Sequence, residues 1–203
     1  MFIATKNGYG LWFDEEEVSV VGPRAAGVKG INLKEGDEVV SGQIIDPKND
    51  VLVLTTQRGA VKRMNLSEFD KTSRAKRGVL MLRELKKNPH RIVAVIAAAL
   101  HDTLEIDTEK GTTIPLDIST LRANDRYSNG SFIVDEEEQG EVTHVLLTPE
   151  PAPDDNKNKQ TKTPATGTGG VFLYTGHLAL VLPNKHACNG VHYFNSLVDE
   201  KRK

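Results

Sequence analysis

Two glycines recur at one fixed spacing in three successive segments, and this repeat constrains the fold more than any other feature of the chain. The first glycine of each pair closes a Thr-x-x-Gly turn and the second precedes an apolar run; the pairs are Gly8 and Gly27, Gly59 and Gly78, and Gly111 and Gly130. The separation is 19 residues in every pair, and successive pairs are offset by 51 and 52 residues. A period of about 50 residues indicates copies of one supersecondary unit.

Each copy has the same order of strand-forming segments. In the second copy they are residues 51–55 before the turn glycine, 60–64 after it, 79–85 after the second glycine, and 92–97 at the end. Four strands per copy are typical of a blade in a radial β array, so we predict an all-β fold with blades near 1–46, 51–97 and 103–148. An antiparallel sandwich remains an alternative, although it requires no 51-residue period. Only the links, for example 66–69, have room for a helical turn.

The formal net charge of −2 conceals an uneven distribution of charge along the chain. Residues 58–91 carry 11 basic and 3 acidic side chains, a net charge of +8, whereas residues 1–57 carry −4 and residues 92–150 carry −9. A concentrated positive segment attracts polyanions. The alternative interpretation, that the charged loops are merely solvated, stays open at this point.

The composition limits the class of protein. One cysteine, Cys188, precludes a disulfide within the chain, and no apolar run approaches the length of a membrane span. The first residues do not resemble a signal peptide. We therefore expect a cytoplasmic globular protein. Neither a nucleotide-binding Gly-Lys-Ser/Thr loop nor a catalytic constellation is evident, so we expect no enzyme activity from this chain alone.

Several short motifs at fixed spacing carry a resemblance to a known family. They are the Thr-x-x-Gly turn, an arginine three or four residues before the second glycine, and a loop of the type Leu33-Lys34-Glu35-Gly36-Asp37. These motifs resemble the repeat of the C-terminal domain of the A subunits of gyrase and topoisomerase IV. The string Gln-Arg-Arg-Gly-Gly-Lys-Gly of gyrase is absent, and residues 58–91 and 126–132 look most like the topoisomerase IV side of this family.

The resemblance implies a β-pinwheel, in which each blade exchanges a strand with its neighbour, and a rim that binds and bends duplex DNA without sequence specificity. It implies that catalysis, ATP and Mg²⁺ belong to other regions of the enzyme, so no cofactor or metal is expected in this chain. The implied partners are duplex DNA, the breakage-reunion part of the same polypeptide and the ATPase B subunit, in a bacterial, nucleoid-associated setting. Pinwheels of this family have about six blades, so three clear blades indicate a fragment with an exposed edge.

The basic residues at motif positions are the candidate DNA contacts, because Lys and Arg displace the counterions condensed on DNA phosphates. We expect the second copy to contact DNA most strongly and the first copy to contribute a few more cations. A structural role for Arg24, Arg74 and Arg126 is an equal alternative. The candidate set is Arg58, Lys62, Arg63, Arg74, Lys76, Arg77, Arg83, Lys86, Lys87 and Arg91, with Lys6, Arg24 and Lys29 from the first copy.

Outside the repeats the sequence is less informative. Residues 149–170 are rich in Pro, Thr, Lys and Gly and are typical of a flexible linker, and 171–203 is a tail or a degenerate blade that begins with a hairpin-like pattern. The pattern His186, Cys188, His192 is a poor zinc signal. Two competing functions remain: a gyrase-type DNA-wrapping domain, and a propeller-like protein-interaction module without a DNA role.

Overall fold

The computed structural model describes residues 1–21, 24–48 and 50–148, and the backbone of three strands at 171–174, 177–180 and 192–194. The chain divides into two compact units, Met1–Ser19 with Lys29–Glu150, and Val20–Val28 with Pro151–Lys203. The predicted linker, 149–170, lies outside the described residues. No helix in the described part is long and apolar enough to cross a membrane.

The first sheet combines strands of two sequence repeats. Its order is β3-β1-β2-β6, in which β1 (Phe2–Thr5), β2 (Tyr9–Trp12) and β3 (Val39–Gln43) belong to the first repeat. The outer strand β6 (Val79–Leu80) comes from the second repeat and pairs antiparallel with β2. The second repeat therefore completes the first blade.

The second sheet repeats this arrangement one copy later. Its order is β10-β5-β4-β7, with β4 (Val51–Thr56), β5 (Ala60–Met64) and β7 (Ile92–Ala98) from the second repeat. The outer strand β10 (Ser131–Phe132) comes from the third repeat and pairs with β5. The pairs Gly10–Val79 and Val61–Ser131 are equivalent in the two blades. The predicted all-β pinwheel with strand exchange is thus confirmed.

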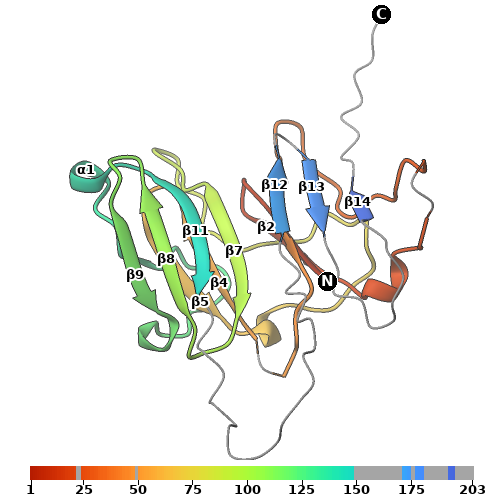
Figure 1. Cartoon of the computed structure of the whole chain (residues 1–203), viewed down its shortest axis with the longest axis horizontal. Coiled ribbons are helices and arrows are strands. Elements are labelled where there is room, and N and C mark those ends of the chain that lie inside the picture. Colours follow the sequence, from red (N-terminus) through yellow and green to blue (C-terminus); the bar gives the residue numbers. More distant parts are fainter. Residues whose placement is uncertain (22–23, 49, 149–170, 175–176, 181–191, 195–203) are drawn as a thin grey trace, which may run out of the picture. The chain divides into compact units, whose positions relative to one another are not determined.

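The third sheet has three strands within the described residues, in the order β11-β8-β9 (Figure 1). They are β8 (Thr103–Thr108), β9 (Thr113–Asp117) and β11 (Val142–Thr148), all antiparallel. Strand β9 has no neighbour on its outer side in the described part of the chain. Pro115 lies in this strand, as is typical of an edge, because proline has no N–H to donate.

The tail beyond the linker contains a small sheet of its own. Strands β12 (Val171–Tyr174), β13 (His177–Leu180) and β14 (His192–Phe194) are consecutive and antiparallel. The hairpin predicted at the start of this segment corresponds to the β12–β13 pair.

The predicted third strands are shorter than expected. We expected a strand after the second glycine of each repeat, at 28–33, 79–85 and 132–134. The second and third repeats form only β6 and β10 there, of two residues each, and the first forms no strand among the described residues. The physical reason is that the chain leaves the sheet after two paired residues to enter the core, where Met81 and Val134 are buried.

The six repeat glycines share one backbone conformation. All have positive φ, between 78° and 99°. At Gly78 a Cβ would overlap the carbonyl of Gly10, and at Gly130 it would lie 2.5 Å from the carbonyl oxygen of Val61. Glycine at these positions therefore allows the exchanged strand to reach the neighbouring blade.

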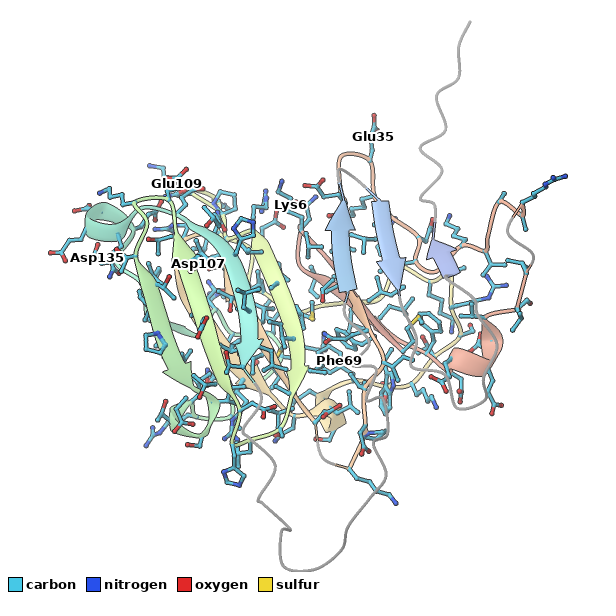
Figure 2. The ribbon with its side chains drawn as sticks, in the orientation of Figure 1. Lys6, Glu35, Phe69, Asp107, Glu109 and Asp135 are labelled. Atoms are coloured by element: carbon cyan, nitrogen blue, oxygen red, sulfur yellow. The ribbon has the colours of Figure 1, made fainter. Side chains whose placement is uncertain are left out.

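The core lies between successive blades. Strand β4 supplies Leu52 and Leu54 to a cluster shared with the first blade, and Val53 to a cluster shared with the third. Phe69, labelled in Figure 2, packs edge-on against Phe2, with ring centroids 5.1 Å apart. Phe13 is fully buried, as expected for a core aromatic. Since β4 is apolar on both faces, it reads as a continuous hydrophobic run.

Short helical turns occupy the links and loops. They are η1 (Glu15–Glu17), η2 (Leu66–Glu68), which lies in the link where a helical turn was predicted, η3 (Ile118–Thr120) and α1 (Glu136–Gln139). Asp14 and Asp135 cap the first and last of these by accepting backbone N–H groups. The acidic runs that follow them, Glu15–Glu17 and Glu136–Glu138, lie in the first turns of these helices, where negative charge is favourable.

Candidate nucleic-acid interface

Five basic side chains of the second repeat are exposed and have no hydrogen-bond or ion-pair partner within the described residues. Lys76 and Arg77 lie in the link before Gly78, and Arg83, Lys86 and Lys87 lie in the segment between β6 and β7. We call these five residues the free cation set: Lys76, Arg77, Arg83, Lys86 and Lys87. All five belonged to the candidates predicted from the sequence.

The loop that carries Lys86 and Lys87 ends in a special backbone conformation. Asn88 has φ of 51°, and the corresponding loops of the first and third repeats contain Gly36 and Gly140, which also have positive φ. Asparagine tolerates this conformation better than most residues. Each of the three loops therefore contains one residue with positive φ, and the loop of the second repeat carries two lysines where that of the first repeat carries only Lys34.

Two arginines hold the repeats together: Arg74, a candidate DNA contact, and Arg126, its equivalent in the third repeat. Arg74 Nη1 donates to the carbonyl oxygen of Lys29 at 2.9 Å, and Arg74 Nε donates to that of Glu17 at 3.0 Å. Arg126 Nη1 donates to the carbonyl oxygen of Leu80 at 2.7 Å. Lys29 and Leu80 are equivalent positions of successive repeats, so both arginines make the same contact. Arg74 and Arg126 therefore have the structural role that the sequence left open as an alternative to DNA contact.

Three further candidates are only partly exposed: Arg58, Arg63 and Arg91. Arg58 Nε forms an ion pair with Glu136 at 2.9 Å, and Arg58 Nη1 donates to the carbonyl of Asn88 at 3.1 Å. Arg91 Nη1 donates to the carbonyl of His90 at 3.0 Å. Arg63 Nε is buried and has no hydrogen-bond partner in the described part of the chain. These three side chains are half-buried, which limits their contact with an external ligand.

The candidates of the first repeat are all exposed. Lys6, labelled in Figure 2, forms an ion pair with Glu38 at 2.5 Å, and Lys29 Nζ donates to Asn32 Oδ1 at 2.7 Å. Arg24 precedes its repeat glycine by three residues, whereas Arg74 and Arg126 precede theirs by four. Arg24 is therefore not the equivalent of the two arginines that tie repeats together.

Lys62 is in the interior and contradicts the expectation that it lies on the DNA-facing surface. Its residue is 1% exposed, and its Nζ donates to the carbonyl oxygens of Met81, Arg126 and Ser128. Burial lowers the pKa of Lys62 to about 8, so the amine is still mostly protonated at pH 7. The physical reason for the correction is the strand register, which places Lys62 opposite the buried Leu54.

Acidic side chains dominate the third blade. Asp107 lies on β8, Glu109 lies in the following turn, and Asp135 lies at the start of α1 (Figure 2). Lys110, a cation of this blade, donates to the carbonyls of Glu137 and Glu138. The positive charge that is free for a ligand is therefore concentrated in the second repeat, between acidic neighbours.

Substitution of Arg126 by Gln separates the structural role from a DNA role. We expect the free energy of unfolding to fall by about 1–3 kcal/mol, because the carbonyl of Leu80 loses a charged donor, while the salt dependence of DNA binding stays unchanged. Urea unfolding and DNA titration measure the two quantities. Arg122→Gln, at an exposed position, is the control and should change stability by less than about 0.5 kcal/mol. A reduced salt slope in Arg126→Gln alone would contradict the structural assignment.

No group of three or more His, Cys, Asp or Glu side chains is placed to hold a metal ion in residues 1–21, 24–48 and 50–148. The weak zinc pattern at residues 186–192 lies outside the residues whose side chains the structure describes.

Comparison with known proteins identifies the family. Residues 1–46 and 50–99 match the family described as DNA gyrase C-terminal domain, beta-propeller. Over 145 residues the chain is 68% identical to the A subunit of DNA topoisomerase 4 from Bacillus subtilis, and the match covers 71% of this chain. The chain belongs to the gyrase A C-terminal-domain family. Within that family its sequence is similar to topoisomerase 4 A subunits, in agreement with the resemblance of residues 58–91 and 126–132.

Solved structures of the gyrase A C-terminal-domain family have the same fold. The C-terminal domain of DNA topoisomerase IV aligns with a TM-score of 0.72 and 57% identity, over 73% of this chain and 46% of that chain. The DNA gyrase A C-terminal domain aligns with a TM-score of 0.61 and 20% identity, over 72% and 49% of the two chains. The chain spans 18% of the length of the B. subtilis relative.

Proposed function

We propose that this chain binds duplex DNA through the phosphate backbone, as a non-catalytic part of a topoisomerase IV-type A subunit. The observation that carries the proposal is the free cation set, five exposed and unpaired cations within residues 76–87 of a chain whose net charge is −2. Lysine and arginine at such positions gain affinity for DNA by releasing condensed counterions. The similarity to topoisomerase 4 A subunits supports the assignment.

The free cation set favours nonspecific binding. Its members are long side chains on a link and a loop, without a helix or strand pair shaped to enter a groove. Contacts of this kind position DNA without reading its sequence, and they permit bending where the duplex is deformable. We propose that the bent segment is presented to the strand-passage gate, for decatenation and relaxation.

The remaining parts of the proposal concern the whole enzyme. Strand breakage, ATP and Mg²⁺ are assigned to the breakage-reunion part of the same polypeptide and to the ATPase B subunit. The setting is the bacterial cytoplasm and nucleoid. The support for these assignments is the similarity to part of one polypeptide of a topoisomerase.

A nicked circular plasmid tests the proposed function. The plasmid is bound by the chain, sealed with ligase and freed of protein, and its linking number is compared with that of plasmid sealed alone. We expect saturable binding with little change in linking number, because the gyrase-type box for full wrapping is absent. A large change of one sign would favour a gyrase-type wrapping domain, and absence of binding would favour a protein-interaction module. Either result would contradict the proposal.

A further inference from the structure

The first and second repeats join through direct backbone hydrogen bonds. The N–H of Ala75 donates to the carbonyl of Gly30 at 2.7 Å, and the N–H of Asn32 donates to the carbonyl of Lys76 at 2.8 Å. These two bonds attach the link of the second repeat to the segment after the second glycine of the first repeat. The junction therefore needs no side chain to satisfy these four backbone groups.

The second and third repeats join differently, although the positions are equivalent. Tyr127, the equivalent of Ala75, turns its N–H to Asp125 Oδ1 at 2.6 Å. Arg83, the equivalent of Asn32, donates its N–H to Asn129 Oδ1 at 2.9 Å. Both backbone N–H groups thus donate to side-chain oxygens, so the carbonyls of Met81 and Ser128, equivalent to those of Gly30 and Lys76, need other donors.

The ammonium group of Lys62 supplies those donors. Its Nζ lies 2.5 Å from the carbonyl oxygen of Met81 and 2.7 Å from that of Ser128. It also lies 2.7 Å from the carbonyl oxygen of Arg126 and 3.4 Å from that of Asp125. An ammonium has three N–H groups and no acceptor, so the three short contacts use all of its donors. We call these four carbonyl oxygens the carbonyl cradle.

The repeat alignment shows that a lysine is exceptional at this position. Strand pairing makes Lys62 equivalent to Leu11 in the first blade and Ile114 in the third, opposite Leu54, Ile3 and Ile106 respectively. Leu11 is buried and belongs to the core. Among the three repeats, the lysine occurs only at the junction where the two backbone hydrogen bonds are missing. The charged side chain at position 62 and the missing backbone bonds are therefore related.

We propose that the carbonyl cradle of Met81, Asp125, Arg126 and Ser128 is a site for a small ammonium ion, that Lys62 is its built-in occupant, and that the occupied cradle holds the third repeat on the second. The site selects a cation with several N–H donors, because converging carbonyl dipoles repel anions and leave neutral groups with too few donors. The charged side chains around it are Asp125 and Glu68, which favour the cation, and Arg126, which opposes it. The inference is independent of DNA binding.

Chemical rescue tests the carbonyl cradle. Lys62→Ala removes the side chain beyond Cβ, and n-propylammonium is the missing part. We expect the thermal midpoint of Lys62→Ala to be lower than that of the wild-type chain, and to rise saturably with n-propylammonium chloride. Propanol, tetramethylammonium chloride and sodium chloride at matched concentration should not reproduce the increase. The wild-type chain should not respond, because its cradle is already filled.

Lys62→Leu is the matched variant, since it copies Leu11 of the first repeat. It fills the space without a donor, so we expect a lowered midpoint and no rescue. Equal rescue by propanol, or an equal response of wild type, would overturn the proposal, as would a midpoint of Lys62→Ala equal to that of wild type. If neither variant folds, NMR of the wild-type chain decides: slowly exchanging Nζ protons of Lys62 at neutral pH support the cradle, and rapid exchange contradicts it.

Discussion

Reversal of the two link charges, Lys76→Glu with Arg77→Glu, is expected to lower duplex DNA affinity at least about tenfold at moderate salt. Both side chains are exposed and unpaired within the described residues, so their loss removes two phosphate contacts and adds two repulsive charges. The slope of log affinity against log salt should become shallower by about 2, close to 0.9 for each lost contact. Fluorescence titration of a labelled duplex at several salt concentrations measures both quantities.

The control for this variant has the same change in net charge at exposed positions outside the second repeat, Lys48→Glu with Arg122→Glu. If the second repeat carries the DNA contacts, the control keeps most of the wild-type slope. Equal losses in both double variants would mean that overall charge, and not the free cation set, determines binding. Thermal unfolding of both proteins verifies that the fold is intact.

Gly78→Ala is expected to lower the free energy of unfolding by at least about 3 kcal/mol and to detach β6 from the first blade. Gly78 has φ of 82°, and a Cβ there would overlap the main-chain carbonyl of Gly10, which cannot move without breaking the β2–β6 pairing. The left-handed conformation alone costs an alanine about 1–2 kcal/mol, and the main-chain overlap adds to it. Urea unfolding measures the loss, and amide exchange of Met81, whose N–H donates to the carbonyl of Gly8, reports on the strand.

Gly111→Ala separates backbone strain from close approach. Gly111 has φ of 79°, nearly the same as Gly78, but a Cβ there would meet nothing within 4 Å. We therefore expect a loss of only about 1–2 kcal/mol. If both variants lost the same free energy, the tight contact between the exchanged strand and the neighbouring blade would not matter, and our account of the repeat glycine would be wrong.

Much of the fold was predictable because its determinants are local and repeat. The positive φ of Gly8, Gly59 and Gly111 follows from the turn between the first two strands, and the 19-residue spacing places the second glycine of each pair. Strand exchange came from the family resemblance. Strand lengths after the second glycine were overestimated, since the apolar residues of 81–85 and 133–134 face the core instead of extending a strand.

The candidate site was only partly predictable, because a sequence shows how many cations a segment has but not which of them are occupied. Arg58 is paired with Glu136, 78 residues away, and no local sequence pattern predicts that contact. Lys62 could have been assigned correctly. An alignment of the repeats places it with Leu11 and Ile114, and a lysine at an aliphatic position of a buried strand indicates an interior amine.

Arg24 illustrates the opposite case. Arg24 was grouped with Arg74 and Arg126 although it is one residue closer to its repeat glycine. Arg74 and Arg126, which share the same spacing, also make the same contact with the neighbouring repeat. A motif that allows a spacing of either three or four residues therefore groups arginines at positions that are not equivalent.

The measurement that tests the central claim most directly is the affinity of the wild-type chain for a duplex of random sequence, as a function of salt concentration. If all five members of the free cation set contact phosphates, the slope of log affinity against log salt is about −4.5, and affinity falls about 500-fold between 50 and 200 mM salt. An affinity that does not change over this range, or no measurable binding at 50 mM, would contradict the account.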